Sequence, residues 1–565
     1  VHICTFHAFC NEVIQNNLSL FEKNSLDPIS DLERTALLKE LIDELPKNHP
    51  LKRYRSDAYY EVRNLQWLFS NMKREGWTSA FILQQIDRYL ADLPNRDEYI
   101  AKKAVNGFKK GDVRTDKIAA EAEKMERLRA AAQLFDVFQN KMRAQNRYDF
   151  DDMINWVIHA FETNPELLAR YQEQYLYILV DEYQDTSGTQ NRIVELLINF
   201  WEHPNVFVVG DDDQSIYRFQ GANVENMQQL ARRFEGSLLK VVLTNNYRST
   251  QPILDVATTL IGNNRERLIH HMPGLTKALQ ASHPNRQQST VLPRVLQYET
   301  HRQELIGLAV HLRQLLAQGV QPGRIAVIYR ENKYGEELAR YLRHLGLPVY
   351  SKRHVNLFDE RLIQQVVLLL RYLASEHYDR PFSGDAMLFE LLHYSWWHIP
   401  PIEIARLSVE AANHRYNRSK EVSPEWGSLR GLLAYKCSQP ATDLFTPAIS
   451  ETLRHAATVM EELIAAVPNV TLQVLVQQVI HRTGLLQHHL HGPDKHWHLK
   501  LLAAFFDFVQ EETRRNPHMQ LSDLVHTLDL MQQEKITLPL VQVSGSEKGI
   551  NLLTAHGSKG LEFEY

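Results

Sequence analysis

Residues 175–186 of the chain have the sequence YLYILVDEYQDT, and this stretch decides the fold. Its first six residues are rich in β-branched and aromatic side chains, which predicts a buried strand. Two carboxylates, Asp181 and Glu182, follow at the carboxyl end of that strand, where open α/β sheets place their ligands. In a nucleotide-hydrolysing core, one such carboxylate holds Mg²⁺ and the next orients the attacking water. Because a solvated loop also carries acidic residues, the pair by itself leaves both interpretations open.

Two more predicted strands end in polar residues. The strand over residues 206–210 (VFVVG) is followed by DDDQ at 211–214, and the strand over 238–243 (LLKVVL) is followed by TNNYR at 244–248. An amphipathic helix is predicted over residues 191–201, between the first two strands. This alternation of strands and helices predicts a parallel sheet with its polar clusters on one edge.

Three side chains in these clusters suit the recognition of a nucleotide. Gln214 can hydrogen-bond a γ-phosphate and so report its loss. Arg248 offers the planar, permanently charged group that suits a phosphoryl group in transition. Tyr247 can stack on a base. Their position after successive strands predicts a site for nucleotide hydrolysis.

Six blocks of the chain resemble, in the same order, the motifs of the UvrD/Rep family of superfamily 1 DNA helicases. The blocks are TFHAF (5–9), DFDDM (149–153), DEYQDT (181–186), VGDDDQSIY (209–217), NYRST (246–250) and TAHGSKGLE (554–562). The resemblance implies an α/β fold with two RecA-like parallel-sheet cores, each interrupted by a mainly helical insertion. It also implies an enzyme, an ATP-dependent 3′–5′ DNA helicase that translocates on single-stranded DNA and acts at junctions of single- and double-stranded DNA.

The same resemblance implies roles for individual residues, with ATP bound between the two cores. Asp181 would hold Mg²⁺ and Glu182 would be the catalytic base. The remaining nucleotide contacts implied are Gln214 and Arg248 at the γ-phosphate, Tyr247 at the adenine, Glu562 at the ribose, and Gly560. The DNA contacts implied are Thr5, His7, Tyr217, Phe219, His556, Ser558 and Lys559.

Aromatic residues beside the predicted γ-phosphate contact suit single-stranded DNA. Stacking of a base on an aromatic ring is worth roughly 1–3 kcal/mol and does not depend on sequence. Tyr217 and Phe219 follow Gln214 closely, so stacking there would be coupled to the nucleotide. The alternative for Phe219, as for Phe6, is packing in the core.

Two features depart from the family pattern. The chain has no Gly-Lys dipeptide, with which the family's phosphate loop ends, and it runs from Val1 to Tyr565 without the last family motif. We therefore expect an internal fragment that does not hydrolyse ATP by itself. Residues 218–221 are RFQG, where UvrD and Rep usually have Gly or Ser, Trp, Arg and Gly, and the Arg-Phe pair is similar to the helicase–nucleases AddA and RecB. The alternatives are a subunit of such a helicase–nuclease, with a nuclease domain beyond Tyr565, or a non-hydrolysing DNA-binding or scaffold protein.

Composition agrees with a large globular protein of a reducing compartment. Of the 565 residues 44% are hydrophobic and 23% are charged, and the three cysteines make no disulfide framework. No apolar run approaches the roughly 20 residues that cross a bilayer, so we expect no membrane partner and a place in the bacterial cytoplasm or nucleoid. The net charge of −5 argues against wholesale binding of duplex DNA, although local grooves can still be positive.

Helix and strand patterns, taken together with the resemblance to the UvrD/Rep family, divide the chain into six segments. We predict a first core at residues 1–16 and 117–250, interrupted by a helical insertion at 17–116. We predict a second core at residues 251–361 and 541–565, interrupted by a helical insertion at 362–540. In the second core, strands are predicted at 294–298, 325–330 and 550–554, and helices at 303–316 and 334–345.

Several other segments are interpreted as structural. The histidines of residues 488–498 lack the spacing and the cysteines of a metal site. The aromatic residues of 394–401 are expected to pack inside the second insertion. Basic clusters at residues 52–55, 102–103 and 109–110 are expected on a solvated face, although the family's first insertion can contact DNA.

Overall fold

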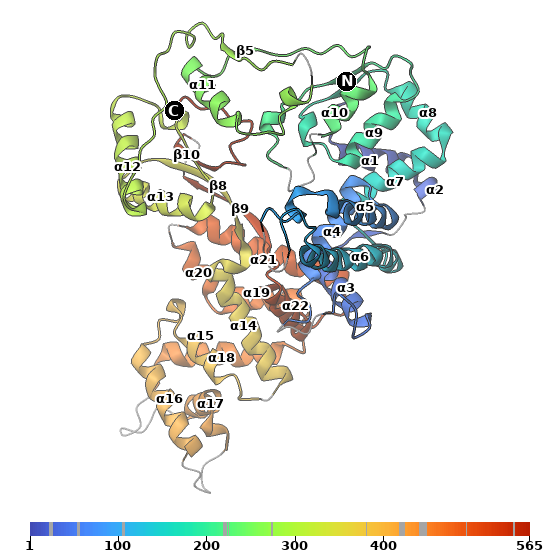
Figure 1. Cartoon of the computed structure of the whole chain (residues 1–565). Coiled ribbons are helices and arrows are strands. Elements are labelled where there is room, and N and C mark those ends of the chain that lie inside the picture. The colour runs from blue at the N-terminus through green and yellow to red at the C-terminus, as the bar shows by residue number, and fades with distance from the viewer. Residues whose placement is uncertain are drawn as a thin grey trace. The chain divides into compact units, whose positions relative to one another are not determined.

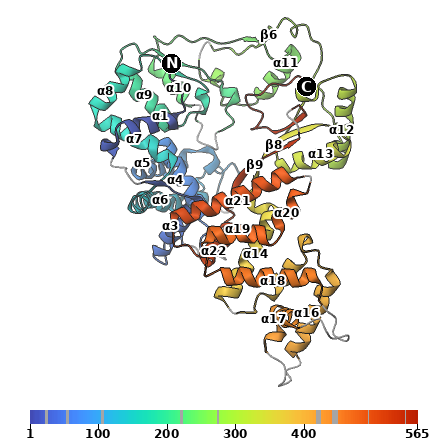
Figure 2. The same cartoon turned by 180° about the vertical axis from the view of Figure 1, so that it is seen from behind.

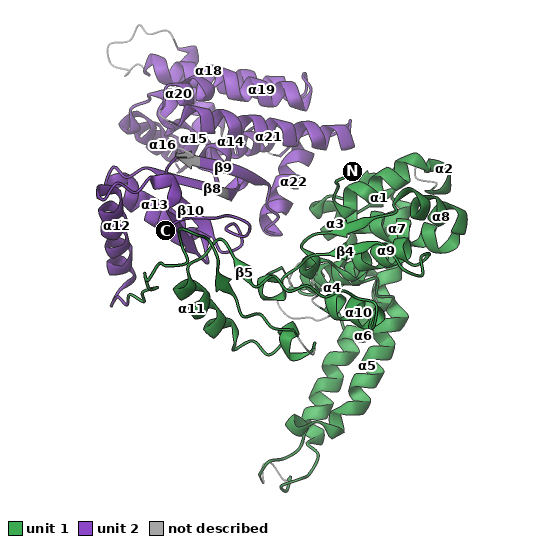
Figure 3. Ribbon diagram, turned by 90° about the horizontal axis from the view of Figure 1, so that it is seen from above, with its two compact units in different colours: residues 1–296 green, residues 297–565 purple. Residues whose placement is uncertain are grey.

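The computed structural model describes most of the chain as two compact units, Val1–Leu296 and Gln297–Tyr565 (Figure 3). The described residues are 1–21, 26–52, 57–103, 108–217, 223, 225–272, 275–379, 381–416, 424–439, 449–492, 494–545 and 548–565. The described residues of the first unit form three two-stranded sheets, and those of the second unit form one four-stranded sheet. Each unit has buried hydrophobic residues of its own, and each is described by itself below.

The first unit contains helices α1 to α11 and strands β1 to β6 (Figure 1). Its helices are α1 (Phe6–Asn16), α2 (Leu18–Phe21), α3 (Asp31–Glu44), α4 (Val62–Glu75), α5 (Ser79–Asp92), α6 (Thr115–Ala144), α7 (Phe150–Thr163), α8 (Pro165–Gln174), α9 (Gly188–Ile198), α10 (Glu225–Arg233) and α11 (Gln251–Ile261). Its strands are β1 (Asp27–Pro28), β2 (Arg147–Tyr148), β3 (Ile178–Val180), β4 (Val206–Val208), β5 (Asn245–Asn246) and β6 (Gln280–Ala281).

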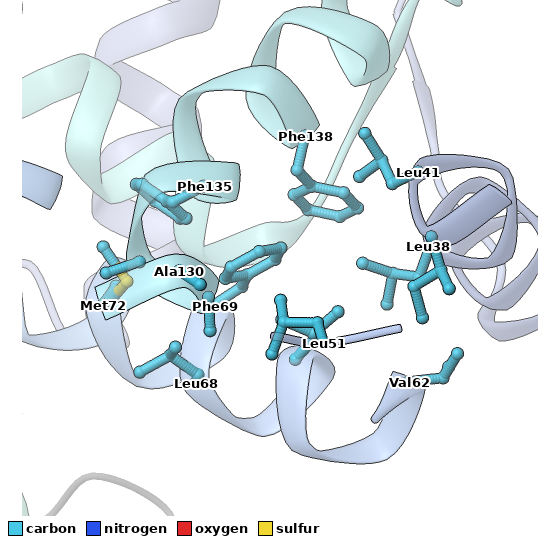
Figure 4. Close-up of a cluster of buried hydrophobic side chains, with 14 of the residues drawn as sticks. Leu38, Leu41, Leu51, Val62, Leu68, Phe69, Met72, Ala130, Phe135 and Phe138 are labelled. Carbon is cyan, nitrogen blue, oxygen red and sulfur yellow. The ribbon is translucent and has the colours of Figure 1, made fainter. Parts of the chain in front are cut away.

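Helices α3 to α6 pack around one hydrophobic cluster, which Figure 4 shows in part. On α4 the buried positions recur every three or four residues, which places them on one face of the helix. The aromatic rings of Phe69 on α4 and of Phe135 and Phe138 on the 30-residue helix α6 lie against one another there. Leu38 of α3 is fully buried in the same cluster. These helices form the helical insertion of the first unit, and α6 packs with it although residues 117–144 were predicted to belong to the first core.

The core of the first unit combines a second set of helices with the sheet β3–β4. Helices α1, α7, α8 and α9 share one cluster, and Val180 of β3 packs with Val194 of α9 and Leu230 of α10 in another. Strands β3 and β4 are parallel, with Ile178 opposite Val206 and Val180 opposite Val208. The sheet therefore presents the carboxyl ends of both strands at one edge.

Local sequence signals set the ends of the helices around this core. Asp149 accepts from the backbone N–H of Asp152 and the Asp152 carboxylate accepts from that of Asp149, a capping box that starts α7. Ser187 and Gln190 form the same arrangement at the start of α9. Helix α4 ends at Gly76, whose φ of 66° lies in the left-handed region that glycine adopts without strain.

The second unit contains a mixed four-stranded sheet of order β7-β10-β8-β9. Its strands are β7 (Ala326–Tyr329), β8 (Val349–Asn356), β9 (Pro539–Gly545) and β10 (Ile550–Thr554). Strand β10 is parallel to both β7 and β8, whereas β9 is antiparallel to β8. Helices α12 (His301–Ala317) and α13 (Asn332–His344) share a buried cluster with β10.

Between β8 and β9 the second unit is mainly helical. Its helices are α14 (Arg361–Tyr378), α15 (Asp385–Leu392), α16 (Pro401–Tyr416), α17 (Leu429–Ser438), α18 (Glu451–Ala466), α19 (Leu472–Arg482), α20 (Leu485–Leu490), α21 (Lys495–Arg515) and α22 (Leu521–Gln533). Helix α19 packs against α18 and α21, as Figure 2 shows. The predicted α/β class, with two parallel-sheet cores each interrupted by a mainly helical insertion, is confirmed.

Two predicted strands are wrong, although the residues concerned are all described. Residues 238–243 and 294–298 have no regular secondary structure, and Leu239, Leu243 and Val295 are largely exposed. The predicted three-stranded sheet is therefore the pair β3–β4, while β5 pairs with β6 instead. A β-rich composition favours an extended chain, but a strand also needs a neighbour in register to pair with its N–H and C=O groups.

Candidate functional site

The loops that follow β3 and β4 meet at the carboxyl edge of the sheet. The N–H of Val209 donates to the carbonyl of Val180 at 2.9 Å, and the N–H of Tyr183 donates to the carbonyl of Val209 at 2.9 Å. These two bonds extend the pairing past the strands themselves. They bring the predicted residues that follow β3 and β4 beside each other.

Asp181 and Glu182 stand exposed at the end of β3. Glu182 has a φ of 50°, in the left-handed region that is costly for a residue with a side chain. Its N–H donates to Oδ1 of Asp181 at 2.9 Å, which helps to hold this conformation. The next side chain, Tyr183, is fully buried and anchors the turn by donating from its hydroxyl to Asn191.

Gln184 joins the two loops through its side-chain amide, and it is 1% exposed. Its Nε2 donates to Oε2 of Glu182 at 2.6 Å, and its Oε1 accepts from the backbone N–H of Asp211 at 3.0 Å. Gly210 allows this contact, because a Cβ at that position would lie 2.6 Å from Oε1 of Gln184. Glycine at position 210 therefore lets the two loops approach each other without displacing the Gln184 side chain.

Asp211 connects this bridge to Gln214 and to a lysine far along the chain. Its Oδ2 accepts from Nε2 of Gln214 at 2.7 Å, and its Oδ1 contacts Nζ of Lys277 at 2.7 Å. Burial by itself would raise the pKa of Asp211, but the hydrogen bonds from Lys277 and Gln214 hold that pKa below its ordinary value. The Lys277 ammonium also contacts Asp212, and it lies 3.2 Å from Asp213.

Arg267 adds a second cation to the acidic loop. Arg267 forms a bidentate ion pair with Asp213, in which Nε and Nη2 lie 2.8 and 2.7 Å from the two carboxylate oxygens. The N–H of Leu268 donates to the carboxylate of Asp212 at 2.7 Å. The segment after α11 therefore holds the loop that carries Gln214. Sequence reasoning missed Gln184, Arg267 and Lys277, because the two cations lie more than fifty residues from their partners and show no local pattern.

Tyr247 and Arg248 follow β5 and are exposed. The side chain of Asn246 accepts from the N–H groups of Arg248 and Ser249, at 3.0 and 2.7 Å, which fixes the turn into α11. The guanidinium of Arg286 donates to the carbonyl of Arg248. The predicted strand that would carry Tyr247 and Arg248 beside β4 is not formed, so these two residues lie after a separate pair of strands.

Thr5 and His7 lie at the start of α1. Thr5 is the N-cap residue, and its Oγ1 accepts from the N–H of Ala8 at 3.2 Å. The ring of His7 meets that of Phe150 edge to face, with centroids 6.5 Å apart, and Phe150 is 61% exposed. Nε2 of His7 lies 4.0 Å from Asp151, a carboxyl whose pKa is raised by burial although Arg74 partly offsets this. His7 therefore lies beside an exposed aromatic ring.

In the second unit the turn after β10 carries the other predicted residues. His556 is exposed, whereas Ser558 and Lys559 are half-buried. The N–H of Ser558 donates to the carbonyl of Thr554 at 3.0 Å, and Gly560 has a φ of 81°. Glu562 is exposed beyond this glycine. The turn thus groups these polar side chains at the carboxyl end of β10.

Comparison with known proteins identifies the family. Residues 1–235 match the model of the UvrD/REP helicase N-terminal domain, and residues 241–383 match that of the UvrD-like helicase C-terminal domain. The chain belongs to the UvrD/Rep helicase family. The putative ATP-dependent DNA helicase YjcD of Bacillus subtilis is 32% identical over 247 residues, which are 44% of this chain and 30% of that protein.

Matches to other members of the UvrD/Rep family are longer. The ATP-dependent DNA helicase PcrA of Leuconostoc citreum is 27% identical over 435 residues, and PcrA of Staphylococcus aureus strain Mu50 is 25% identical over 438 residues. Each match covers 76% of this chain and 54% of the PcrA protein. The chain thus spans about half the length of these PcrA relatives.

Two further segments that the sequence analysis interpreted as structural are the basic cluster at residues 52–55 and the aromatic residues of 394–401. Nζ of Lys52 donates to the carbonyls of Asp43 and Leu45, both at 2.9 Å, at the end of α3. Trp396 and Trp397 are buried, which confirms the predicted packing in the second insertion. Residues 53–55 and Phe219 lie outside the described residues, and Tyr217 is half-buried.

The histidine-rich segment forms a close imidazole pair. Nδ1 of His489 and Nδ1 of His498 are 3.2 Å apart. Burial, together with neighbouring His498 and His488, lowers the pKa of His489 to about 4. In the described part of the chain no group of three or more histidine, cysteine or acidic residues is arranged to hold a metal ion. Nor is any helix there both long and apolar enough to cross a membrane.

Proposed function

We propose that the full-length protein is an ATP-dependent DNA helicase that translocates 3′ to 5′ on single-stranded DNA and acts at its junctions with duplex DNA. Membership of the UvrD/Rep family supports this, as do the names of the PcrA and YjcD relatives. The observation that carries the proposal is the bonded link from Glu182 to Gln214 through Gln184 and Asp211. A hydrolytic site needs a base and a phosphate contact within reach of one nucleotide.

The proposed chemistry uses Glu182 and Gln214 at the β3–β4 edge together with Tyr247 and Arg248, which follow β5. Glu182 accepts a proton from the attacking water, and Gln214 hydrogen-bonds the γ-phosphate. Arg248 stabilises the charge that develops on the phosphoryl group, and Tyr247, which is 61% exposed, stacks on the adenine. Gly560 and Glu562, in the turn after β10, are further proposed nucleotide contacts, with Glu562 at the ribose.

Asp181 is proposed as one ligand of a Mg²⁺ ion that accompanies the nucleotide. Mg²⁺ is usually bound by one or two carboxylates together with substrate phosphates, and an exposed aspartate at a strand end could supply one such carboxylate. When bound, the ion neutralises charge on the β- and γ-phosphates. The Glu182 N–H holds one oxygen of Asp181, which orients the carboxylate.

DNA contacts are proposed in each of the two units. Thr5 and His7 at the start of α1, and His556, Ser558 and Lys559 after β10, carry donors for the phosphate backbone. Tyr217 and Phe219 would stack on bases, which links base contact to the loop of Gln214. The named relatives are bacterial, and we propose that the protein acts in the bacterial cytoplasm, where the chromosome lies.

ATP hydrolysis by the full-length gene product, with and without single-stranded DNA, tests the proposal. We expect stimulation by DNA, and we expect Glu182→Gln to lower kcat by roughly 10²–10⁴-fold while nucleotide binding is retained. Glu202→Gln is the matched control, because Glu202 is an exposed glutamate in the same unit. Wild-type turnover in Glu182→Gln would remove Glu182 from its role, and no hydrolysis under any condition would favour a DNA-binding or scaffold protein.

Unwinding assays test the direction of movement. The full-length protein is incubated with ATP, Mg²⁺ and a partial duplex that has either a 3′ or a 5′ single-stranded tail, and release of the displaced strand is measured. We expect unwinding of the 3′-tailed duplex, and preference for the 5′-tailed duplex would contradict the proposed polarity.

A further inference from the structure

We propose that Gln184 is a positioning residue that couples the catalytic base Glu182 to the γ-phosphate contact Gln214. This inference rests on the proposed function. Gln184 is 1% exposed, and its amide lies between the loops that carry the two groups. It acts on the reaction through its neighbours and not by touching the nucleotide.

The two ends of the amide have different partners, which fixes its orientation. Nε2 can only donate, and it faces Oε2 of Glu182 at 2.6 Å. Oε1 can only accept, and it faces the N–H of Asp211 at 3.0 Å. Reversing the amide would set oxygen against carboxylate and NH₂ against N–H, so both contacts would become repulsive. The glutamine side chain therefore holds Glu182 in one orientation relative to the loop after β4.

Asp211 continues the connection from Gln184 to the γ-phosphate contact Gln214. Its backbone N–H is bound by Gln184, while its carboxylate accepts from Gln214 at 2.7 Å and contacts Lys277 at 2.7 Å. When the Gln214 amide donates a hydrogen bond to a γ-phosphate, its hydrogen bond to the Asp211 carboxylate must break or weaken. The resulting shift of Asp211 reaches Glu182 through a single side chain, that of Gln184. The arrangement thereby links the presence of a γ-phosphate to the position of the base.

Gly210 lies directly against both the side chain and the backbone of Gln184. A Cβ added to Gly210 would meet Oε1 of Gln184 at 2.6 Å, the backbone nitrogen of Gln184 at 3.2 Å and Cε of Met227 at 3.3 Å. The carbonyl of Gln184 also lies 3.4 Å from the hydroxyl of Ser215, which donates to it. The added methyl group of Gly210→Ala should therefore push the Gln184 amide out of position, while Glu182, Gln184, Asp211 and Gln214 themselves are unchanged.

The first test is steady-state ATP hydrolysis by the full-length gene product with saturating single-stranded DNA. Gln184→Met keeps the size of the side chain but removes both hydrogen bonds. A hydrogen bond to a charged group contributes about 1.5–3 kcal/mol, so kcat should fall roughly tenfold to a hundredfold with little change in KM for ATP. We expect Gly210→Ala to show the same pattern.

The matched control is Gln172→Met. Gln172 is buried to a similar degree in the same unit, and its Nε2 donates to the carbonyl of Leu196 at 2.8 Å, away from the β3–β4 edge. Thermal unfolding of both methionine variants reports any general loss of stability. An equal loss of kcat in Gln172→Met and Gln184→Met would overturn the inference, because the effect would then be one of stability alone.

A second variant gives a readout that a purely structural role would not move. Gln184→Glu keeps an acceptor for the N–H of Asp211 but replaces the donor to Glu182 by a second carboxylate. We expect kcat to fall while KM for ATP changes little, because the base loses the group that orients it. A kcat equal to that of wild type, or an equal change in kcat and KM, would overturn the inference.

Failure of this inference and failure of the proposed function give different results. If Glu182→Gln abolishes turnover while Gln184→Met and Gly210→Ala turn over like wild type, the coupling is refuted and the function stands. If Glu182→Gln itself turns over like wild type, the assignment of the base fails.

Discussion

Replacing Lys73 by methionine tests how the helical insertion of the first unit is joined to its core. Lys73, on α4, is 3% exposed, and its ammonium lies 2.6 Å from Asp149 and 2.9 Å from Asp152. These two aspartates form the capping box of α7. Methionine has a similar volume, so the change mainly removes the charge and leaves two carboxylates buried without their cation. Breaking a buried ion pair in this way costs about 3–5 kcal/mol.

The loss should depend on pH. Although burial acts to raise the pKa of Asp149, the Lys73 ammonium holds that pKa below its ordinary value. The stabilisation from Asp149 is therefore present above the unfolded-state pKa of about 3.9 and is lost as the pH falls through the lower folded-state pKa. Burial already raises the pKa of Asp152 in the wild type although Lys73 partly offsets this. Without Lys73, burial raises the pKa of both carboxyls further, and ionising them costs stability as the pH rises. The difference between wild type and variant should be largest near neutral pH and should shrink toward about pH 4.

Hydrogen exchange over α4 and α7 measures this effect as a free energy of local opening. Lys124→Met is the control, because Lys124 forms an exposed ion pair with Glu121 on α6, and we expect no measurable change there. Adding Asp152→Asn to Lys73→Met should restore part of the loss, since it removes one unpaired charge. A loss below about 1 kcal/mol, or a loss that does not shrink on acidification, would refute the reasoning.

Two further predictions concern other buried charges. Arg430→Met should lower the free energy of local opening of α14 and α17, measured by hydrogen exchange, by about 3–5 kcal/mol. The reason is that the fully buried Glu376 carboxylate, 2.7 Å from Arg430, loses its cation. Adding Glu376→Gln should recover part of this loss, and no recovery would contradict the mechanism. Lys277→Met should lower the thermal unfolding temperature more at pH 7 than at about pH 2, because Lys277 lowers the pKa of Asp211. That stabilisation is present above the unfolded-state pKa and is lost as the pH falls through the lower folded-state pKa. An equal loss at both pH values would speak against this mechanism.

Much of the secondary structure was predictable because its signals are local. The helices predicted at 303–316 and 334–345 correspond to α12 and α13, and the strand predicted at 550–554 is β10. The strand predicted at 238–243 failed because its β-branched residues indicate only a preference for extended backbone. Whether such a segment becomes a strand depends on a partner that no local pattern specifies.

The predicted site was only partly recoverable from the sequence. Asp181, Glu182 and Gln214 stood out because they follow apolar runs that end in polar residues. Gln184 was visible inside the same motif, but only the structure gives its two partners. Lys277 showed no signal, because its contact with Asp211 spans 66 residues of sequence.

The sequence alone indicated the family and the chemical types of the residues at the β3–β4 edge. It also located helices α9, α12 and α13 and strands β3, β4, β7 and β10. These follow from motif composition and from periodicity, which depend on residues close together in the chain. Only the tertiary structure decided that Gln184 links Glu182 to Asp211, that Lys277 and Arg267 hold the acidic loop, and that Lys73 is buried between two aspartates. The physical reason is that hydrogen bonds and ion pairs depend on distance in space, and packing sets that distance between residues far apart in sequence.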